Sequence, residues 1–175
     1  MKLRYSLTAL SFLVLAAAAF WFVVPQRAVE RLFGGRRNVD TVAHPEQVKA
    51  YRVGPLPEEI YWQDAAYSDY PITSGPIDLS AATAAKVSAA LISPKTYLWD
   101  LAKSCIPVYG VQLSFFRGAE QVDVLLCFEC DILLVGRNGK TVSGEDFDNS
   151  RAVLVRAAKE AFPNDEVIQQ LKEER

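Results

Sequence analysis

Histidine and cysteine are scarce in this sequence, and their scarcity argues against nucleophilic catalysis and against a zinc site. The 175 residues include one histidine, His44, and three cysteines. A catalytic serine or cysteine needs a base held beside it, and His44 lies in a proline-flanked stretch that we expect to be a loop. A structural zinc site needs four ligands, usually from two closely spaced pairs. The sequence therefore favours neither a catalytic residue nor a bound metal.

Nucleotide-binding and hydrolase signatures are also missing, as is an excess of positive charge in the body of the chain. There is no G-x-S-x-G, no P-loop and no G-x-G-x-x-G, so we expect no cofactor. Residues 1–37 hold six of the 19 Lys and Arg but one of the 21 acids, which leaves residues 38–175 with a net charge of -7. An acidic body repels phosphate backbones, so we expect no nucleic-acid partner.

One long apolar run stands at the start of the chain. Residues 5–26 carry no charge and would form about 33 Å of helix, enough to cross a hydrocarbon core of about 30 Å. A cleaved signal peptide is the alternative, because Ala17 to Ala19 satisfy a small-residue cleavage rule. The aromatic residues that follow at once, Phe20 to Phe22, favour an uncleaved anchor. We therefore expect residues 1–37 to be a single-pass anchor in the cell membrane.

The orientation of this anchor depends on opposing signals. Four arginines that follow the run favour a cytoplasmic body: Arg27, Arg31, Arg36 and Arg37. Long domains, however, translocate largely regardless of flanking charge, and a basic start before an apolar run resembles an export signal. We expect the body to lie on the extracytoplasmic side, with the lipid bilayer as one partner.

The body divides by composition into two parts. Residues 38–78 are interrupted by proline and glycine and carry several tyrosines and a tryptophan, so we expect a connecting arm that packs its rings on the core. Such an aromatic cluster binding a sugar or a peptide is the alternative. Residues 79–175 are predicted to form an α+β domain, with helices over about 79–92 and after Ser150.

Between those helices the hydrophobic period changes to two. Pairing Phe116 with Gln121 puts the apolar residues of two successive strands on the same face. The second strand is predicted to continue without a break from Val122 to Leu134. Asn138-Gly139 then favours a type I′ turn. The predicted fold is an N-terminal transmembrane helix followed by a three-stranded antiparallel meander flanked by helices.

The cysteines include one C-x-x-C pair, Cys127 and Cys130, inside the predicted second strand. A thioredoxin-like pair would begin a helix, and extended residues three apart are separated by about 10 Å, beyond the reach of a disulfide. Continuing the strand register places Cys105 on the same face as Cys130. We therefore expect a Cys105–Cys130 bridge in an oxidising compartment, with Cys105–Cys127 as the alternative if Pro107 bends the chain.

Three acids, Asp123, Glu129 and Asp131, alternate on the other face of this predicted strand. Carboxylates so grouped could bind a cation or act in acid–base chemistry. A solvated sheet face has the same pattern. We interpret the three acids as a surface that meets a partner protein.

A further indication comes from resemblance. The stretch Cys105-Ile106-Pro107-Val108-Tyr109-Gly110, followed by a hairpin and Leu126-Cys127-Phe128-Glu129-Cys130, resembles a pattern in a family of small, uncharacterised bacterial proteins that are exported or membrane-anchored. The resemblance covers about residues 100–160 and implies no known activity. Members of that family often place histidine before the glycine, where this chain has Tyr109, which weakens any metal or acid–base role.

These observations give two functional hypotheses. The first is a non-catalytic interaction or assembly module at the cell envelope, which meets an unknown protein partner through a sheet edge or the acidic face. The second is a thiol-dependent metal-binding or redox protein that uses Cys127 and Cys130.

Overall fold

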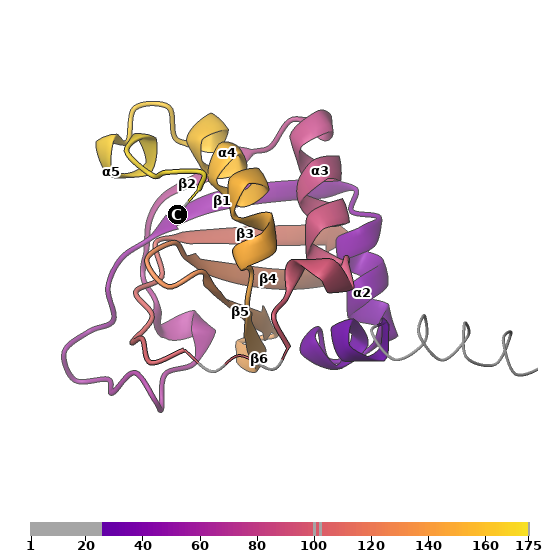
Figure 1. The fold of residues 1–175 in the computed structure, drawn as a ribbon, viewed down its shortest axis with the longest axis horizontal. Coiled ribbons are helices and arrows are strands. Elements are labelled where there is room, and N and C mark those ends of the chain that lie inside the picture. Colours follow the sequence, from indigo (N-terminus) through magenta and orange to yellow (C-terminus); the bar gives the residue numbers. More distant parts are fainter. Residues whose placement is uncertain (1–25, 100, 102, 175) are drawn as a thin grey trace, which may run out of the picture.

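The computed structural model describes residues 26–99, 101 and 103–174, and these form a six-stranded antiparallel sheet with helices (Figure 1). The strand order is β2-β1-β3-β4-β5-β6. Residues 26–32 are helical and precede the other elements. In chain order these are α2 (Arg36–Ala43), β1 (Gln47–Val53), η1 (Tyr67–Asp69), β2 (Ile72–Asp78), α3 (Ala81–Leu91), η2 (Pro94–Thr96), β3 (Val111–Arg117), β4 (Glu120–Cys127), β5 (Ile132–Arg137), β6 (Lys140–Asp146), η3 (Asp148–Ser150), α4 (Arg151–Ala161) and α5 (Glu166–Gln169).

The three-stranded meander predicted from the sequence is wrong, because the sheet has six strands. Two of the additional strands, β1 and β2, lie within residues 38–78, where we expected a connecting arm. The third arises because the predicted strand from Val122 to Leu134 is broken by a turn at residues 128–131. In that turn Asp131 adopts a left-handed backbone conformation with φ 55°. The residues of the turn, 128–131, include no glycine or proline that would have indicated a turn in the sequence.

Predictions that rest on local signals are confirmed. β3 and β4 pair in the expected register, with Phe116 opposite Gln121. Asn138 and Gly139 both have positive φ, 51° and 77°, as a type I′ turn between β5 and β6 requires. The helix expected over about 79–92 is α3, and of the two candidate caps in the sequence, Asp78 and Ser80, it is Ser80 whose side chain accepts a hydrogen bond from the Thr83 amide.

One face of the sheet carries the larger core, which lies under helices. Figure 1 shows α2, α3 and α4 arranged over β1, β3 and β4. Every second residue of β3 and β4 points into this core, as the period-two pattern requires. The largest fully buried side chains here include Phe33, Phe115, Phe147, Leu91 and Leu154.

The opposite face has a smaller apolar cluster that is covered mainly by irregular chain. Its members are Val53, Tyr67, Tyr70, Tyr109, Leu125, Cys127 and Cys130. The ring of Tyr67 lies directly on Gly136, where an added Cβ would come within 2.3 Å of it. Tyr67 and Tyr70 therefore pack on the sheet as expected of the aromatic residues in this stretch, whereas Tyr61 and Trp62 are exposed.

The predicted membrane anchor is not described by the structure. The span expected over residues 5–26 lies outside the described residues, apart from Gln26. Within the part of the chain that is described, no helix is long and apolar enough to cross a bilayer.

Candidate functional site

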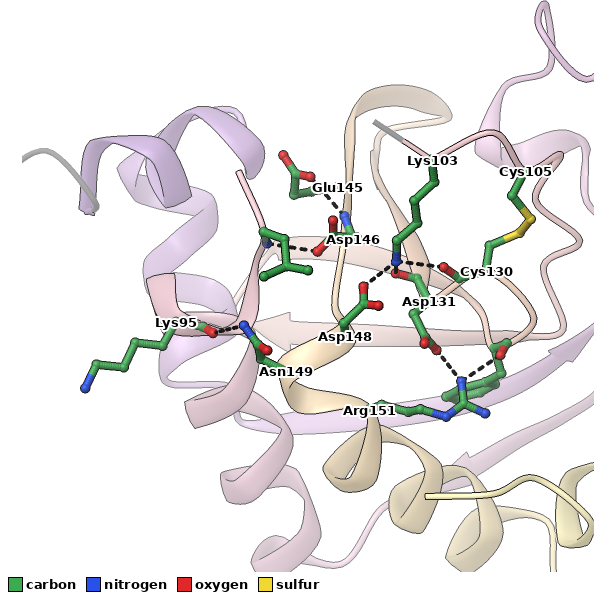
Figure 2. Close-up of polar contacts among 12 residues, drawn as sticks. Lys95, Lys103, Cys105, Cys130, Asp131, Glu145, Asp146, Asp148, Asn149 and Arg151 are labelled. Carbon is green, nitrogen blue, oxygen red and sulfur yellow. Dashed lines mark hydrogen bonds and ion pairs between the residues drawn. A yellow bond between two sulfur atoms is a disulfide. The ribbon is translucent and has the colours of Figure 1, made fainter. Parts of the chain in front are cut away.

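Residues 97–99, 101 and 103–110, which we call the wrapping segment, pass around one end of the sheet. At its start Tyr97 is buried in the core under the helices, and its hydroxyl donates to the Leu91 carbonyl. At its end Tyr109 belongs to the apolar cluster on the opposite face. The segment therefore connects the two faces of the sheet. It does so at the end of the sheet where the turn between β4 and β5 lies beside the end of β6. Polar contacts and two cysteines concentrate at this end (Figure 2).

Cys105 of the wrapping segment and Cys130 of the β4–β5 turn lie at disulfide distance, with their Cα atoms 6.2 Å apart (Figure 2). This is the pair that we expected. Cys127 is free and fully buried, so the alternative Cys105–Cys127 pair is not the one observed. Our assumption that Cys127 and Cys130 lie in one extended strand is wrong, because β4 ends at Cys127 and the turn follows.

Lys103 makes a second connection between the wrapping segment and the same turn. Its Nζ donates to the carbonyl oxygens of Cys130, at 2.8 Å, and Asp131, at 3.4 Å. It also forms an ion pair with Asp148 of η3, and both side chains are largely shielded from solvent. The ammonium group thus gathers three segments that are distant in sequence, as Figure 2 shows.

Arg151 fixes the turn from the helix side. Its Nη1 donates to the Phe128 carbonyl at 2.7 Å and pairs with the Asp131 carboxylate, while its Nε donates to the Lys172 carbonyl at 2.9 Å. The Arg151 and Asp131 side chains are 9% and 1% exposed. Because a buried pair that loses one partner leaves an uncompensated charge, this contact makes the turn conformation sensitive to either residue.

Asp146, at the end of β6, is 3% exposed, and only one of its two carboxylate oxygens has a hydrogen-bond partner among the described residues. Its Oδ1 accepts a hydrogen bond from the Leu98 amide at 2.9 Å, whereas its Oδ2 has no hydrogen-bond partner among the described residues. Burial raises the pKa of Asp146, although the Leu98 amide and the charge of Lys103 oppose the shift. The pKa of the neighbouring Glu145 is raised as well, again mainly by burial.

Beside these carboxylates the surface forms a small pocket of about 170 Å³. It is lined by Leu101, Lys103, Ile132, Gly144, Glu145 and Asp146. The wrapping segment, β5 and β6 each contribute to its wall. Its size suits a single side chain better than a drug-sized ligand, which typically fills about 300–1,000 Å³.

The wrapping segment also exposes apolar side chains to solvent. Leu101, Ile106 and Val108 are 51%, 62% and 52% exposed, and Leu98 is partly exposed. Single exposed apolar residues are ordinary on protein surfaces. Four within eleven positions of one chain segment are more informative and make this segment a candidate binding surface.

The acids that we interpreted as a partner surface are not brought together on one exposed face. Asp123 is 1% exposed and lies on the face opposite the helices, where Ser114 Oγ donates to it at 2.5 Å and Gln121 Nε2 at 2.9 Å. Asp131 is buried in its pair with Arg151. Glu129 alone is exposed, at the tip of the turn. For Glu129 and Asp131 the physical reason is the break in the predicted strand, since it ends the alternation after Cys127. Asp123 lies before the break and is buried among the side chains of its own face of the sheet.

His44 lies elsewhere, on the wall of a groove of about 530 Å³ between the start of β1 and α3. Its side chain is exposed. Within residues 26–99, 101 and 103–174, no three His, Cys, Asp or Glu side chains are grouped so that they could hold a metal ion.

Comparison of the chain with family models, curated proteins and solved structures finds no match in any of the three. The resemblance of residues 100–160 to small exported or membrane-anchored bacterial proteins is tested by none of these comparisons and stays a prediction.

Sequence reasoning missed Lys103, Asp146 and Arg151, although two of them carry a signal. Lys103 is the sole charged residue between positions 101 and 116, in an otherwise apolar and neutral stretch. Arg151 is the first residue of α4, where the helix dipole disfavours a cation. A charge in an unfavourable position indicates a specific partner. Nothing in the sequence around Asp146 distinguishes it from Glu145 or Asp148.

Proposed function

We propose that this chain is a non-catalytic interaction module at the cell envelope, attached to the membrane through its N-terminal apolar run. It docks a protein partner through the wrapping segment. The observation that carries this proposal is the combination of exposed apolar side chains at Leu101, Ile106 and Val108 with a fixed base beneath them.

The fixed base matters because ordering a flexible loop on binding costs free energy. Each immobilised side chain costs about 0.5–1.5 kcal/mol, in addition to the ordering of the loop itself. Cys105 and Lys103 attach the wrapping segment to the β4–β5 turn before any partner arrives. A segment held in this way presents its apolar residues at a lower entropic cost than a free loop would.

The placement of the body outside the cytoplasm has separate support. Disulfides persist in secreted and envelope proteins and are rare in the cytosol. The Cys105–Cys130 pair lies at the distance that a disulfide needs. This bridge forms in the mature protein, and the domain faces an oxidising compartment.

Two observations weigh against the thiol-dependent alternative. Cys127 is fully buried, whereas a reactive thiol needs access to its substrate. Cys130 is directed to Cys105, so the C-x-x-C pair does not act as a unit in this conformation.

The test uses the full chain in its native membrane, with the double substitution Ile106→Asp and Val108→Asp. We expect the solubilised wild-type protein to migrate as a complex with one discrete protein, and the double variant to migrate alone. Val167→Asp on α5 is the matched control, because Val167 is at least as exposed as Ile106 and Val108 but lies outside the wrapping segment. A photo-crosslinker placed at Ile106 should give an adduct with that same protein. Adducts with lipid alone, or identical migration of all three proteins, would refute the proposal.

A further inference from the structure

The pocket beside the wrapping segment contains a carboxylate that the described chain leaves without compensation. Asp146 Oδ2 is buried and accepts no hydrogen bond from any described residue. Leaving a buried charged oxygen unpaired is costly, and folded proteins rarely retain such a group without a use. Asp146 is also one of the residues that line the pocket, so its buried carboxylate lies next to a space that a ligand can enter, and a small shift of the wall would bring Oδ2 into contact with that ligand.

The charges around the pocket are unequally paired. Lys103 from the wrapping segment pairs with Asp148 of η3, and Arg151 of α4 pairs with Asp131 of the turn. Neither Asp146 nor Glu145 of β6 forms an ion pair with a described residue. The six groups together carry four negative and two positive charges, so the site has an excess of two negative charges.

We propose that this pocket receives the guanidinium or ammonium group of one arginine or lysine of the protein that docks on the wrapping segment. The inference rests on the proposed function and specifies the chemistry of the partner. The volume of about 170 Å³ fits one such side chain. Leu101, which is 51% exposed, and Ile132 line the pocket and offer apolar surface to the aliphatic stem of that side chain.

A cation in this position would resolve the electrostatic problem of the site. It would offer N–H donors to the unpartnered Oδ2 of Asp146, and charge-assisted hydrogen bonds are about twice as strong as neutral ones. The pKa values of Asp146 and Glu145, which burial raises, would both be lowered, because a nearby positive charge favours the ionised carboxyl. The partner would therefore bind more weakly as the pH falls and these carboxyls become protonated.

The test measures binding of side-chain analogues to the full chain by NMR, in detergent micelles. The probes are n-butylguanidinium and n-butylammonium, with n-butanol as the uncharged control. We expect both cations to shift the backbone amide signals of Leu98 and Gly144 saturably, whereas n-butanol does not. Asp146→Asn should weaken this binding at least tenfold. Glu129→Gln is the matched control, because it removes one negative charge from the exposed tip of the nearby turn, and it should change the affinity by less than twofold.

The outcomes separate this inference from the proposed function. Equal shifts with n-butanol, shifts that follow ionic strength without saturating, or unchanged binding in Asp146→Asn would each overturn the inference. If Asp146→Asn does not fold, Glu145→Gln in the same pocket takes its place and should weaken binding several-fold. If Asp146→Asn keeps the native complex that Ile106→Asp with Val108→Asp loses, the inference fails and the interaction module stands. If the wild-type chain binds the cations but forms no complex, the proposed function fails and the cation pocket remains, without a protein to supply its ligand.

Discussion

The two faces of the sheet are stabilised in different ways. Under α2, α3 and α4 lies a large core that consists mainly of Val, Leu, Phe and Ala. On the opposite face a smaller cluster contains three tyrosines and two cysteines, and irregular chain covers it. Helices bury one apolar stripe and satisfy their own backbone groups. Irregular chain cannot do this, so it needs side-chain hydrogen bonds and a covalent link.

The contacts that hold the irregular cover in place bear this out. Tyr67 accepts a hydrogen bond from the Gly139 amide through its hydroxyl, and its own amide donates to Thr141 Oγ1. Lys103 and Cys105 attach the wrapping segment at the end of the sheet. The helix-covered face thus depends on apolar volume, whereas the opposite face depends on a few specific contacts. Each of the following substitutions separates these two modes.

The largest expected effect is the loss of apolar volume under the helices. Phe115→Ala removes a fully buried ring from β3 and should lower the free energy of unfolding by about 4 kcal/mol. The neighbouring Phe116 lies on the opposite side of the same strand, is partly exposed and faces the Lys49 ammonium. Phe116→Ala is therefore a matched control and should cost about 1 kcal/mol. Urea denaturation measures both, and equal losses would contradict the distinction between the faces.

The next effect is on the covalent link of the opposite face. Replacing Cys105 and Cys130 by Ser opens a link across 25 residues and should lower the free energy of unfolding by about 3 kcal/mol on a chain-entropy model. We expect proteolysis to begin within residues 97–110, while amides under the helices keep their protection from hydrogen exchange. Alkylation of the denatured, unreduced wild-type protein should label Cys127 alone. Three labelled thiols would show that the bridge does not form.

The same contrast explains how much of the fold the sequence predicts. The β3–β4 register, the Asn138-Gly139 turn and the Ser80 cap were predictable because each depends on residues within a few positions of one another. β1 was not, because it pairs with β3 about sixty residues further along, and such a pairing leaves no periodic signal. The turn at 128–131 was missed because Asp131 adopts a positive φ within an apolar run.

The candidate site divides in the same way. The pairing of Cys105 with Cys130 was predicted by extending the strand register, and the structure places the two residues at disulfide distance. The register itself does not extend that far, because β4 ends at Cys127. The pocket could not be predicted, because its wall combines residues from the wrapping segment, β5 and β6. Burial of Asp123 and Asp131, which removes the expected acidic surface, depends on the same long-range assembly.

The smallest expected effect concerns Asp146, and its sign is opposite to the others. A carboxyl whose pKa is raised on folding binds its proton more tightly in the folded state, so its contribution to stability is complete below the unfolded value of 3.8 and is lost as the pH rises through the folded value. At pH 7 the buried carboxylate therefore opposes folding, and Asp146→Asn should raise the free energy of unfolding by about 1 kcal/mol. The gain should vanish near pH 3.5, as urea denaturation at the two pH values would measure.

The control for this substitution is Asp148→Asn, which breaks the ion pair with Lys103 and should lower stability at pH 7. A loss of stability in Asp146→Asn at pH 7 would mean that the carboxylate is compensated within the folded chain and needs no external cation. A gain, together with lost binding of n-butylguanidinium, would identify Asp146 as a residue that lowers stability in exchange for recognition. The end of the sheet would then differ from both faces, because its polar groups are completed by a partner and not by the chain itself.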